Sequence, residues 1–222
     1  MRKGFGVCCI LLGICCLLAS VGWIVYNHWE DENAQKASEN ILQDVRENIL
    51  NNTHEENVPE ESLPEENHSK ESFPAESDSD ESVELPPDVP QEMLTTQVNG
   101  YDCIGILSIP VLELELPVLT DWSYEKLKMA PCHYFGSYFE TDFVIAAHDY
   151  HSHFGRLSEL KAKDLILFTD ISGTVYYYEV VLLETLPGHA TEEMITSGFD
   201  LSLYTCTPGG AGRVTVRCDA VE

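Results

Sequence analysis

The chain of 222 residues carries 38 acidic side chains against 12 basic ones, which gives a formal net charge of −26. This acidity excludes nucleic acid as a partner, because binding to phosphates requires a basic surface. The length allows one or two domains. About twenty of the acidic residues lie between positions 30 and 92, beside only three basic ones, so the rest of the chain is only moderately acidic.

Residues 1–28 are predicted to be a short cytoplasmic tip and a transmembrane anchor. Arg2 and Lys3 precede an apolar run over residues 5–26. These roughly 22 residues would form a helix of about 33 Å, enough for the core of a bilayer. Basic residues before the run and acidic residues after it predict a single span, with the N-terminus in the cytoplasm and the rest of the chain outside the cell. A cleaved signal peptide is the alternative, but no Ala-x-Ala site closes the run.

Residues 29–96 are interpreted as an acidic extracellular stalk that is largely disordered. Its first part has a helical pattern, since Ile41, Leu42, Val45 and Ile49 fall on one face of a helix. Its second part is dominated by Pro, Ser and Glu as far as residue 90, and it lacks the apolar residues needed for a core. The stalk would either hold the folded part away from the membrane or serve only as a tether.

Residues 97–222 are predicted to be one folded domain that is mainly β. About 120 residues are enough to bury a single core. Short apolar or alternating runs separated by turn residues predict several strands and few helices, which is typical of a closed barrel or a sandwich. The expected strands are 104–109, 114–119, 143–147, 164–169, 175–183, 201–206 and 213–217, and the expected helices are 123–129, 154–161 and 191–197.

Three side chains near the end of the chain suggest chemistry. His148 follows an apolar strand, Cys206 ends an alternating strand, and Arg213 lies at the start of the next strand. A thiol, an imidazole and a guanidinium placed on strand ends are the parts of a cysteine acyl-transfer site. A buried structural cysteine is the simpler interpretation of Cys206, but the turn that follows it and Arg213 favour catalysis.

These stretches resemble the sortases, the membrane-anchored cysteine transpeptidases of Gram-positive bacteria, over residues 100–218. The sortase signature is Thr-Leu-x-Thr-Cys on a strand, an Arg on the next strand, and an earlier Gly-His or Ala-His after an apolar strand. This chain has Ser202 in place of the first Thr of that signature. Three more stretches resemble the family, in family order: 104–110 (IGILSIP), 133–137 (HYFGS) and 153–157 (HFGRL). The resemblance implies a closed eight-stranded β-barrel with short helices and with the site on one face of the barrel.

The resemblance also implies roles for the site residues. Cys206 would be the nucleophile, His148 the general acid and base, and Arg213 the partner of the substrate carbonyl, with Thr205 in support. Arg217, four residues further on, is the rival of Arg213, but the family places its Arg at the start of the last strand.

Metal binding and disulfide formation are the remaining questions that the residue types raise. His148, His151 and His153 could bind zinc together with Cys206, but their spacing matches no common closed site. Glu192 and Glu193 lie where some sortases bind calcium, and two adjacent acids do not define a site, so no cofactor is expected. The sequence leaves open whether the other extracellular cysteines form a disulfide or are buried thiols; these are Cys103, Cys132 and Cys218.

The resemblance predicts a transpeptidase that recognises a Leu-Pro-x-Thr-Gly-like sorting signal on a secreted protein. It would hold the cleaved protein as a thioester on Cys206 and pass it to an amine of a peptidoglycan precursor or of a pilin. One alternative is a cysteine peptidase or hydrolase of the cell envelope, although papain-like enzymes place Cys before His. The other is a non-catalytic wall-binding module on a membrane stalk.

Overall fold

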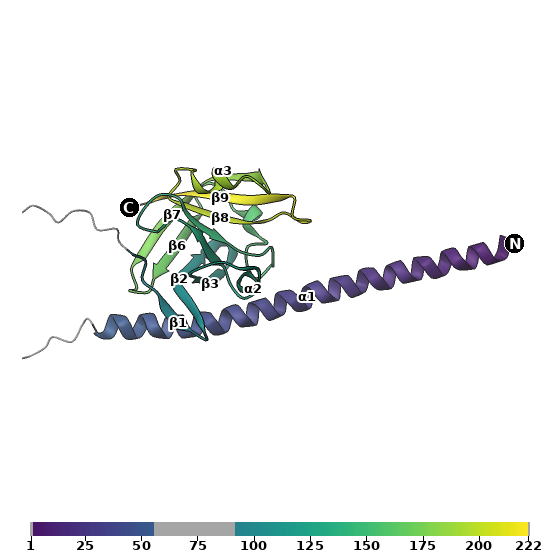
Figure 1. Cartoon of the computed structure of the whole chain (residues 1–222), viewed down its shortest axis with the longest axis horizontal. Helices are drawn as coiled ribbons and strands as arrows, with labels where there is room; N and C mark the ends of the chain where they lie inside the picture. The colour runs from purple at the N-terminus through teal and green to yellow at the C-terminus, as the bar shows by residue number, and fades with distance from the viewer. Residues whose placement is uncertain (1, 56–91, 222) are drawn as a thin grey trace, which may run out of the picture.

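A computed structural model describes residues 2–55 and 92–221, and it places a β-barrel beside one end of a long helix (Figure 1). The elements are, in chain order, α1 (Arg2–Glu55), β1 (Thr96–Val98), β2 (Tyr101–Ile109), η1 (Pro110–Leu112), β3 (Leu114–Leu119), α2 (Tyr124–Leu127), β4 (Cys132–Phe135), β5 (Phe143–Ala146), η2 (Leu157–Glu159), β6 (Leu165–Asp170), β7 (Val175–Pro187), α3 (Thr191–Ile195), β8 (Leu201–Cys206) and β9 (Gly212–Ala220), where η marks a 3₁₀ helix.

The strands of the described residues close into a barrel. Their order is β2-β3-β4-β5-β8-β9-β7-β6, and the pairing of β6 with β2 completes the ring of eight. The short β1 pairs with β2 outside this ring. Most pairs are antiparallel, but β5 and β8 run parallel, as do β3 and β4. The closed eight-stranded barrel that the resemblance to the sortases implies is therefore confirmed.

The interior of the barrel is filled by apolar side chains from every side of the ring. Phe143, Phe168 and Leu203 are fully buried there, and the ring centroids of the two phenylalanines are 5.2 Å apart. Since a fully buried side chain of this size stabilises a fold by about 1.5–3 kcal/mol, this layer accounts for much of the driving force for closure. It also makes the strand ends rigid, and these ends position the candidate site.

Helix α1 is one continuous element that contains both the predicted membrane anchor and the first part of the predicted stalk. The helical face predicted from Ile41, Leu42, Val45 and Ile49 is buried against β1, β2 and β3. The helix shows no break near residue 28, where the anchor was expected to end, because the apolar face that follows is covered by the barrel. Residues 29–55 are thus part of the folded body, and the predicted disordered part over residues 56–91 lies outside the described residues.

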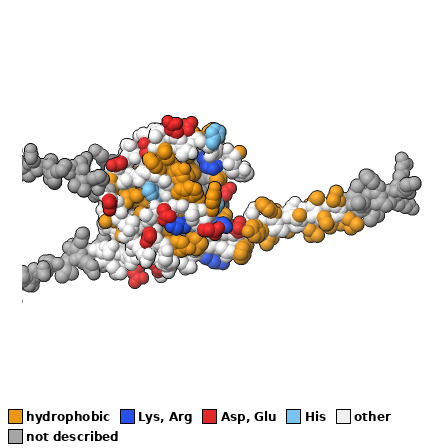
Figure 2. Space-filling view, in the orientation of Figure 1, with side chains coloured by type: hydrophobic (Ala, Val, Ile, Leu, Met, Phe, Trp, Pro, Cys, Tyr) orange, Lys and Arg blue, Asp and Glu red, His pale blue; other side chains and the backbone are white. Residues whose placement is uncertain are grey.

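Over residues 10–28, α1 extends away from the barrel and exposes apolar side chains (Figures 1 and 2). An 18-residue window of this helix has a mean hydropathy of 2.0, and none of it is buried. By length and composition, α1 is able to cross a membrane. This agrees with the predicted single-pass anchor.

The short helices differ in part from those expected. Ser123 caps α2, since its hydroxyl accepts a hydrogen bond from the amide of Lys126 at 3.2 Å. The helix expected over residues 154–161 is instead a turn followed by η2. The buried side chains there are Phe154, Leu157 and Leu160. Their spacing of three residues fits the three-residue turn of a 3₁₀ helix better than the α-helical period, which explains the difference.

Candidate active site

Cys206 and Arg213 lie directly opposite each other on neighbouring strands. Cys206 is the last residue of β8, Arg213 is the second residue of β9, and the two are register partners. Directly opposed residues of an antiparallel pair point to the same face of the sheet. The turn between the strands contains Gly209 and Gly210 at φ values of +84° and +76°, a backbone conformation that favours glycine.

His148 is brought to Cys206 by the parallel pairing of β5 with β8. Ala146 pairs with Tyr204, and the amide of Ala147 donates to the carbonyl of Tyr204 at 3.1 Å. The hydroxyl of Thr205 then donates to the carbonyl of Ala147 at 2.8 Å. The two strand ends are therefore held together at the residues just before His148 and Cys206.

The three side chains line one cavity of about 150 Å³ at the end of these strands. Cys206, His148 and Arg213 are all half-buried, so they are both positioned and reachable. Aromatic rings and residues of the β7–α3 region form much of the rest of the wall. These are Trp122, Tyr124, Tyr134, Tyr204, Pro187, Gly188, Ala190, Thr191 and Met194.

The environment of His148 favours the neutral imidazole. Burial lowers the pKa of His148, and the neighbouring carboxylate of Asp149 offsets part of this effect. Within the described residues its Nε2 atom has no hydrogen-bond partner, and its ring lies 5.0 Å from the ring of Tyr150. An imidazole in this state can accept a proton from an incoming group and return it later.

Arg213 and Arg217 occupy very different positions. The guanidinium of Arg213 donates to the carbonyls of Gly210 and Gly212 at 3.1 and 2.9 Å and borders the cavity. Arg217 is 1% exposed and does not line the cavity. It donates to Glu184 at 2.9 Å, to Ser202 at 2.8 Å and to the carbonyl of Glu193 at 2.7 Å. Arg217 thus ties α3 to the barrel, whereas Arg213 lines the cavity.

The residues considered for metal binding do not come together. His151 is exposed, while His153 is fully buried among Tyr150 and its neighbours. In the part of the chain that the structure describes, no three His, Cys, Asp and Glu side chains gather as potential metal ligands, and this includes the surroundings of Glu192 and Glu193.

The other thiols of the barrel are buried and unpaired. Cys103, Cys132 and Cys218 are free cysteines with no exposed surface. Burial raises the pKa of Cys103 and of Cys132 to about 12, and it raises the pKa of Cys218 as well. These thiols stay protonated at neutral pH and are poor nucleophiles.

The aromatic wall of the cavity was not predicted from the sequence. Tyr204 could have been found, because it lies two residues before Cys206 on the same strand and alternation places both on one face. Its ring packs edge-on against that of Tyr134, with the ring centroids 5.4 Å apart. The ring centroids of Tyr134 and Trp122 are 5.7 Å apart. Tyr134 and Trp122 come from separate parts of the chain, and no local pattern marks them.

A closed eight-stranded barrel with a thiol, an imidazole and a guanidinium around one cavity defines a class of β-barrel protein equipped for acyl transfer. The family model for the Sortase domain matches residues 107–221, and the chain therefore belongs to the sortase family. Members of this family are cysteine transpeptidases. A search of curated proteins found no match.

Solved structures support the same fold. Sortase A from Corynebacterium diphtheriae is 24% identical, with a TM-score of 0.50 over 55% of this chain and 62% of that chain. Sortase C1 from Streptococcus agalactiae is 25% identical, with a TM-score of 0.50 over 57% of this chain and 71% of that chain. The chain thus spans less than two thirds of the length of the Corynebacterium sortase.

Proposed function

We propose that this protein is a membrane-anchored transpeptidase that uses Cys206 to cleave a Leu-Pro-x-Thr-Gly-like sorting signal on a secreted protein. The observation that carries the proposal is the meeting of Cys206, His148 and Arg213 around one cavity at the ends of β8, β5 and β9. The N-terminus lies in the cytoplasm and the barrel outside the cell, as the charges on either side of the apolar run favour.

The first step is acylation of the thiol. Neutral His148 takes the proton from the thiol of Cys206, and the thiolate attacks the carbonyl carbon of Thr in the signal. The guanidinium of Arg213 stabilises the negative charge that develops on the carbonyl oxygen. His148, which now carries the proton of the thiol, gives it to the departing amine as the C–N bond breaks. The N-terminal part of the substrate is then a thioester on Cys206.

The second step transfers the protein to an acceptor. An amine of a peptidoglycan precursor or of a pilin gives a proton to His148 and attacks the thioester. The new amide forms and the C–S bond breaks. The departing thiolate of Cys206 takes the proton back from His148, which restores the thiol and the neutral imidazole. Thr205 acts as a positioning residue, since its hydrogen bond to Ala147 holds the two strand ends together.

The test is covalent capture of the site by a Leu-Pro-x-Thr peptide that ends in a thiol-reactive group. Mass spectrometry of proteolytic fragments should find the adduct on Cys206. Cys132→Ala, which removes a buried thiol, should be labelled like the parent, and Cys206→Ala should not be labelled. A protein whose Cys206 stays unreactive would instead be a non-catalytic wall-binding module.

A second measurement separates transfer from hydrolysis. The protein is given a sorting peptide together with a primary amine, and the products are identified. An amide with the added amine supports the transpeptidase. Free peptide acid as the sole product, whatever the amine concentration, would identify a cysteine peptidase of the cell envelope.

A further inference from the structure

The apolar part of α1 ends in a group of aromatic residues that marks a membrane boundary. Trp23, Tyr26 and Trp29 are 67%, 51% and 58% exposed, and they close the apolar run. Tryptophan and tyrosine gather at the level of the lipid head groups, because their rings have both apolar and polar parts. The boundary of the bilayer therefore lies close to Trp23–Trp29 along the helix axis.

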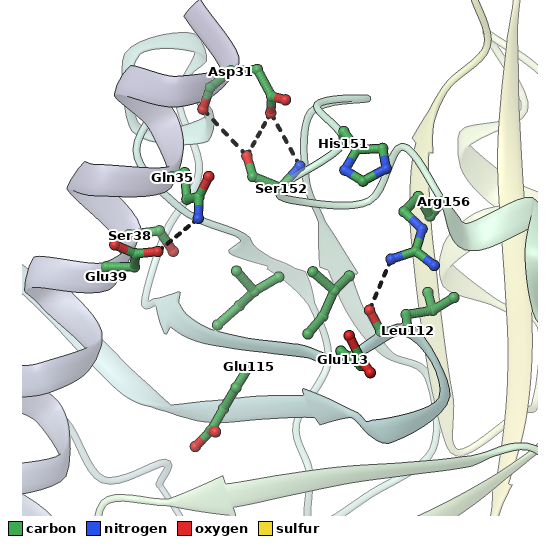
Figure 3. Close-up of a pocket in the computed structure, with 12 residues that line it drawn as sticks. Asp31, Gln35, Ser38, Glu39, Leu112, Glu113, Glu115, His151, Ser152 and Arg156 are labelled. Atoms are coloured by element: carbon green, nitrogen blue, oxygen red, sulfur yellow. Dashed lines mark hydrogen bonds between the residues drawn. The ribbon is translucent and has the colours of Figure 1, made fainter.

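The barrel is attached to α1 immediately beyond this boundary. The carboxylate of Asp31 accepts hydrogen bonds from the amide of Ser152 at 3.1 Å and from its hydroxyl at 2.6 Å (Figure 3). Asp31 lies five residues after Tyr26, or about 8 Å along a helix. Ser152 belongs to the loop that follows His148. The loop of the candidate active site is thus fixed next to the membrane boundary.

A second attachment lies further along the helix and fixes the angle of the barrel. Val45 and Ile49 are buried against β1–β3, Arg46 forms an ion pair with Glu115, and Asn48 donates to the hydroxyl of Thr96 at 3.1 Å. These contacts lie about 14–18 residues after Asp31, which is about 21–27 Å of helix. Two attachments at this separation prevent the barrel from pivoting about the helix.

The turn between β8 and β9 reaches the level of the aromatic group. A cavity of about 650 Å³ is lined by Trp23 and Asn27 of α1 on one side and by His148, Pro208 and Gly209 on the other. Figure 1 shows the β8–β9 hairpin pointing along α1 toward its N-terminus, with the C-terminus of the chain at the opposite end of the barrel. The active-site end of the barrel is therefore its membrane-facing end.

The composition of this turn suits a lipid surface. Residues 207–212 read Thr-Pro-Gly-Gly-Ala-Gly and carry no charge, in a chain whose net charge is −26. Residues 208–211 are exposed. A turn without charges can enter the head-group layer without the cost of removing an ion from water, which an acidic turn would incur.

We propose that α1 holds the active-site end of the barrel against the bilayer, with the β8–β9 turn in the head-group layer. The cavity of Cys206 then opens at the membrane surface and takes its peptide from there rather than from the surrounding solution. The placement of the turn rests on α1 being a membrane anchor, and the route of the substrate rests on the proposed function.

The test uses tryptophan fluorescence in the full-length protein. The chain has three tryptophans. They are replaced by tyrosine, which keeps a ring with a polar group at the membrane boundary, and Pro208→Trp supplies the only tryptophan. The protein is inserted in phosphatidylcholine vesicles that contain a lipid carrying a nitroxide on its head group. We expect strong quenching by this lipid and weak quenching by iodide in the water. Tyr177→Trp in the same background is the matched control, since Tyr177 is 48% exposed and its carbonyl accepts a hydrogen bond from Val221 near the C-terminus. It should show the reverse.

Equal quenching of the two probes, or no lipid quenching at Pro208→Trp while the protein floats with the vesicles, would overturn the inference. If the protein did not float with the vesicles, α1 would not be a membrane anchor, and the placement of the turn in the head-group layer would be wrong as well. Adding Val45→Asp to the Pro208→Trp protein should reduce the lipid quenching, and unchanged quenching would show that α1 packing does not position the turn. Failure of Cys206 to react with a sorting-peptide mimic would disprove the proposed function and leave these quenching results unaltered.

Discussion

Thr205 and Arg217 lie on neighbouring strands and support the site in different ways. Thr205 bridges β8 to Ala147, the residue before His148, so its hydrogen bond helps to hold Cys206 and His148 near each other. Arg217 is buried, and its guanidinium donates hydrogen bonds to Glu184, to Ser202 and to the carbonyl of Glu193 in α3. A buried polar group that loses its partner destabilises the fold. Replacing Arg217 should therefore lower the free energy of unfolding.

The identity of the nucleophile is tested by replacing Cys206. Cys206→Ala should abolish thioester formation and leave the melting temperature close to that of the parent, because Ala fits the half-buried strand end. Cys206→Ser should be nearly as inactive, because a hydroxyl is much harder to ionise than a thiol. Acylation is followed by mass spectrometry with a sorting peptide. Near-normal turnover by either purified variant would refute the mechanism.

The two arginines of β9 should respond in opposite ways to the same change. Arg213→Lys keeps the charge but loses the planar fork, so the acylation rate should fall about a hundredfold with little loss of stability. Arg217→Lys should lose about 2–3 kcal/mol of the free energy of unfolding, since it breaks several buried contacts, and the folded protein should acylate within a fewfold of the parent. Denaturation curves and acylation rates of both variants decide the assignment, and an inactive but stable Arg217 variant would reverse it.

Buried His153 should make the protein sensitive to acid. The pKa of His153 is lowered to about 4, mainly by burial and also by the nearby His148, while Asp31 opposes the shift. The unfolded chain binds a proton near pH 6.5 and the folded chain only near pH 4, so stability is complete above about pH 6.5 and falls as the pH drops toward about 4.

The measurement is the free energy of unfolding between pH 7 and pH 4, compared with His153→Phe. In the described structure neither ring nitrogen of His153 has a hydrogen-bond partner, so phenylalanine loses no bond there. The variant should retain on the order of 3 kcal/mol that the parent loses over this range. Parallel curves for the two proteins would show that His153 does not control the acid response.

At the scale of elements, the sequence predicted most of the barrel and missed its shortest strands. Residues 143–146 are wholly apolar and residues 201–206 alternate, and they became β5 and β8. The three-residue β1 and the four-residue β4 have neither pattern, and they form because neighbouring strands offer partners. Such pairing is a tertiary effect that local propensity does not encode.

The packing of α1 on the barrel can be tested by placing a charge in its buried face. Val45→Asp should detach this half of the helix, because the carboxylate cannot be buried without a partner. If the free energy that holds this part of α1 on the barrel falls by about 2 kcal/mol, amide exchange of residues 34–49 should become about thirtyfold faster, as measured by mass spectrometry. Gln43→Asp, on the exposed face, introduces the same residue and should leave exchange unchanged. Similar exchange in both variants would mean that the apolar face does not hold the helix.

At the scale of the whole molecule, closure of the barrel brings together a site whose parts are far apart in the chain. Thr205 and Ala147 are 58 residues apart and meet because β5 and β8 are neighbours in the ring. The positions of His148 and Cys206 beside one cavity could be predicted, because His148 follows a recognisable strand and Cys206 ends another. The cavity wall could not, since Trp122 and Tyr134 are placed by how strands and loops meet rather than by any local pattern.

Closure of the barrel also separates its four thiols into two kinds. Cys103, Cys132 and Cys218 face packed interiors, and burial keeps them protonated, whereas Cys206 stands at an open strand end opposite Arg213. Iodoacetamide at pH 7.5 should therefore modify only Cys206 among these four in the folded full-length protein, and all four in denaturant. Peptide mapping of the alkylated sites gives the result. Rapid alkylation of any of the other three under native conditions would mean that the barrel opens locally, and it would contradict the tight closure described here.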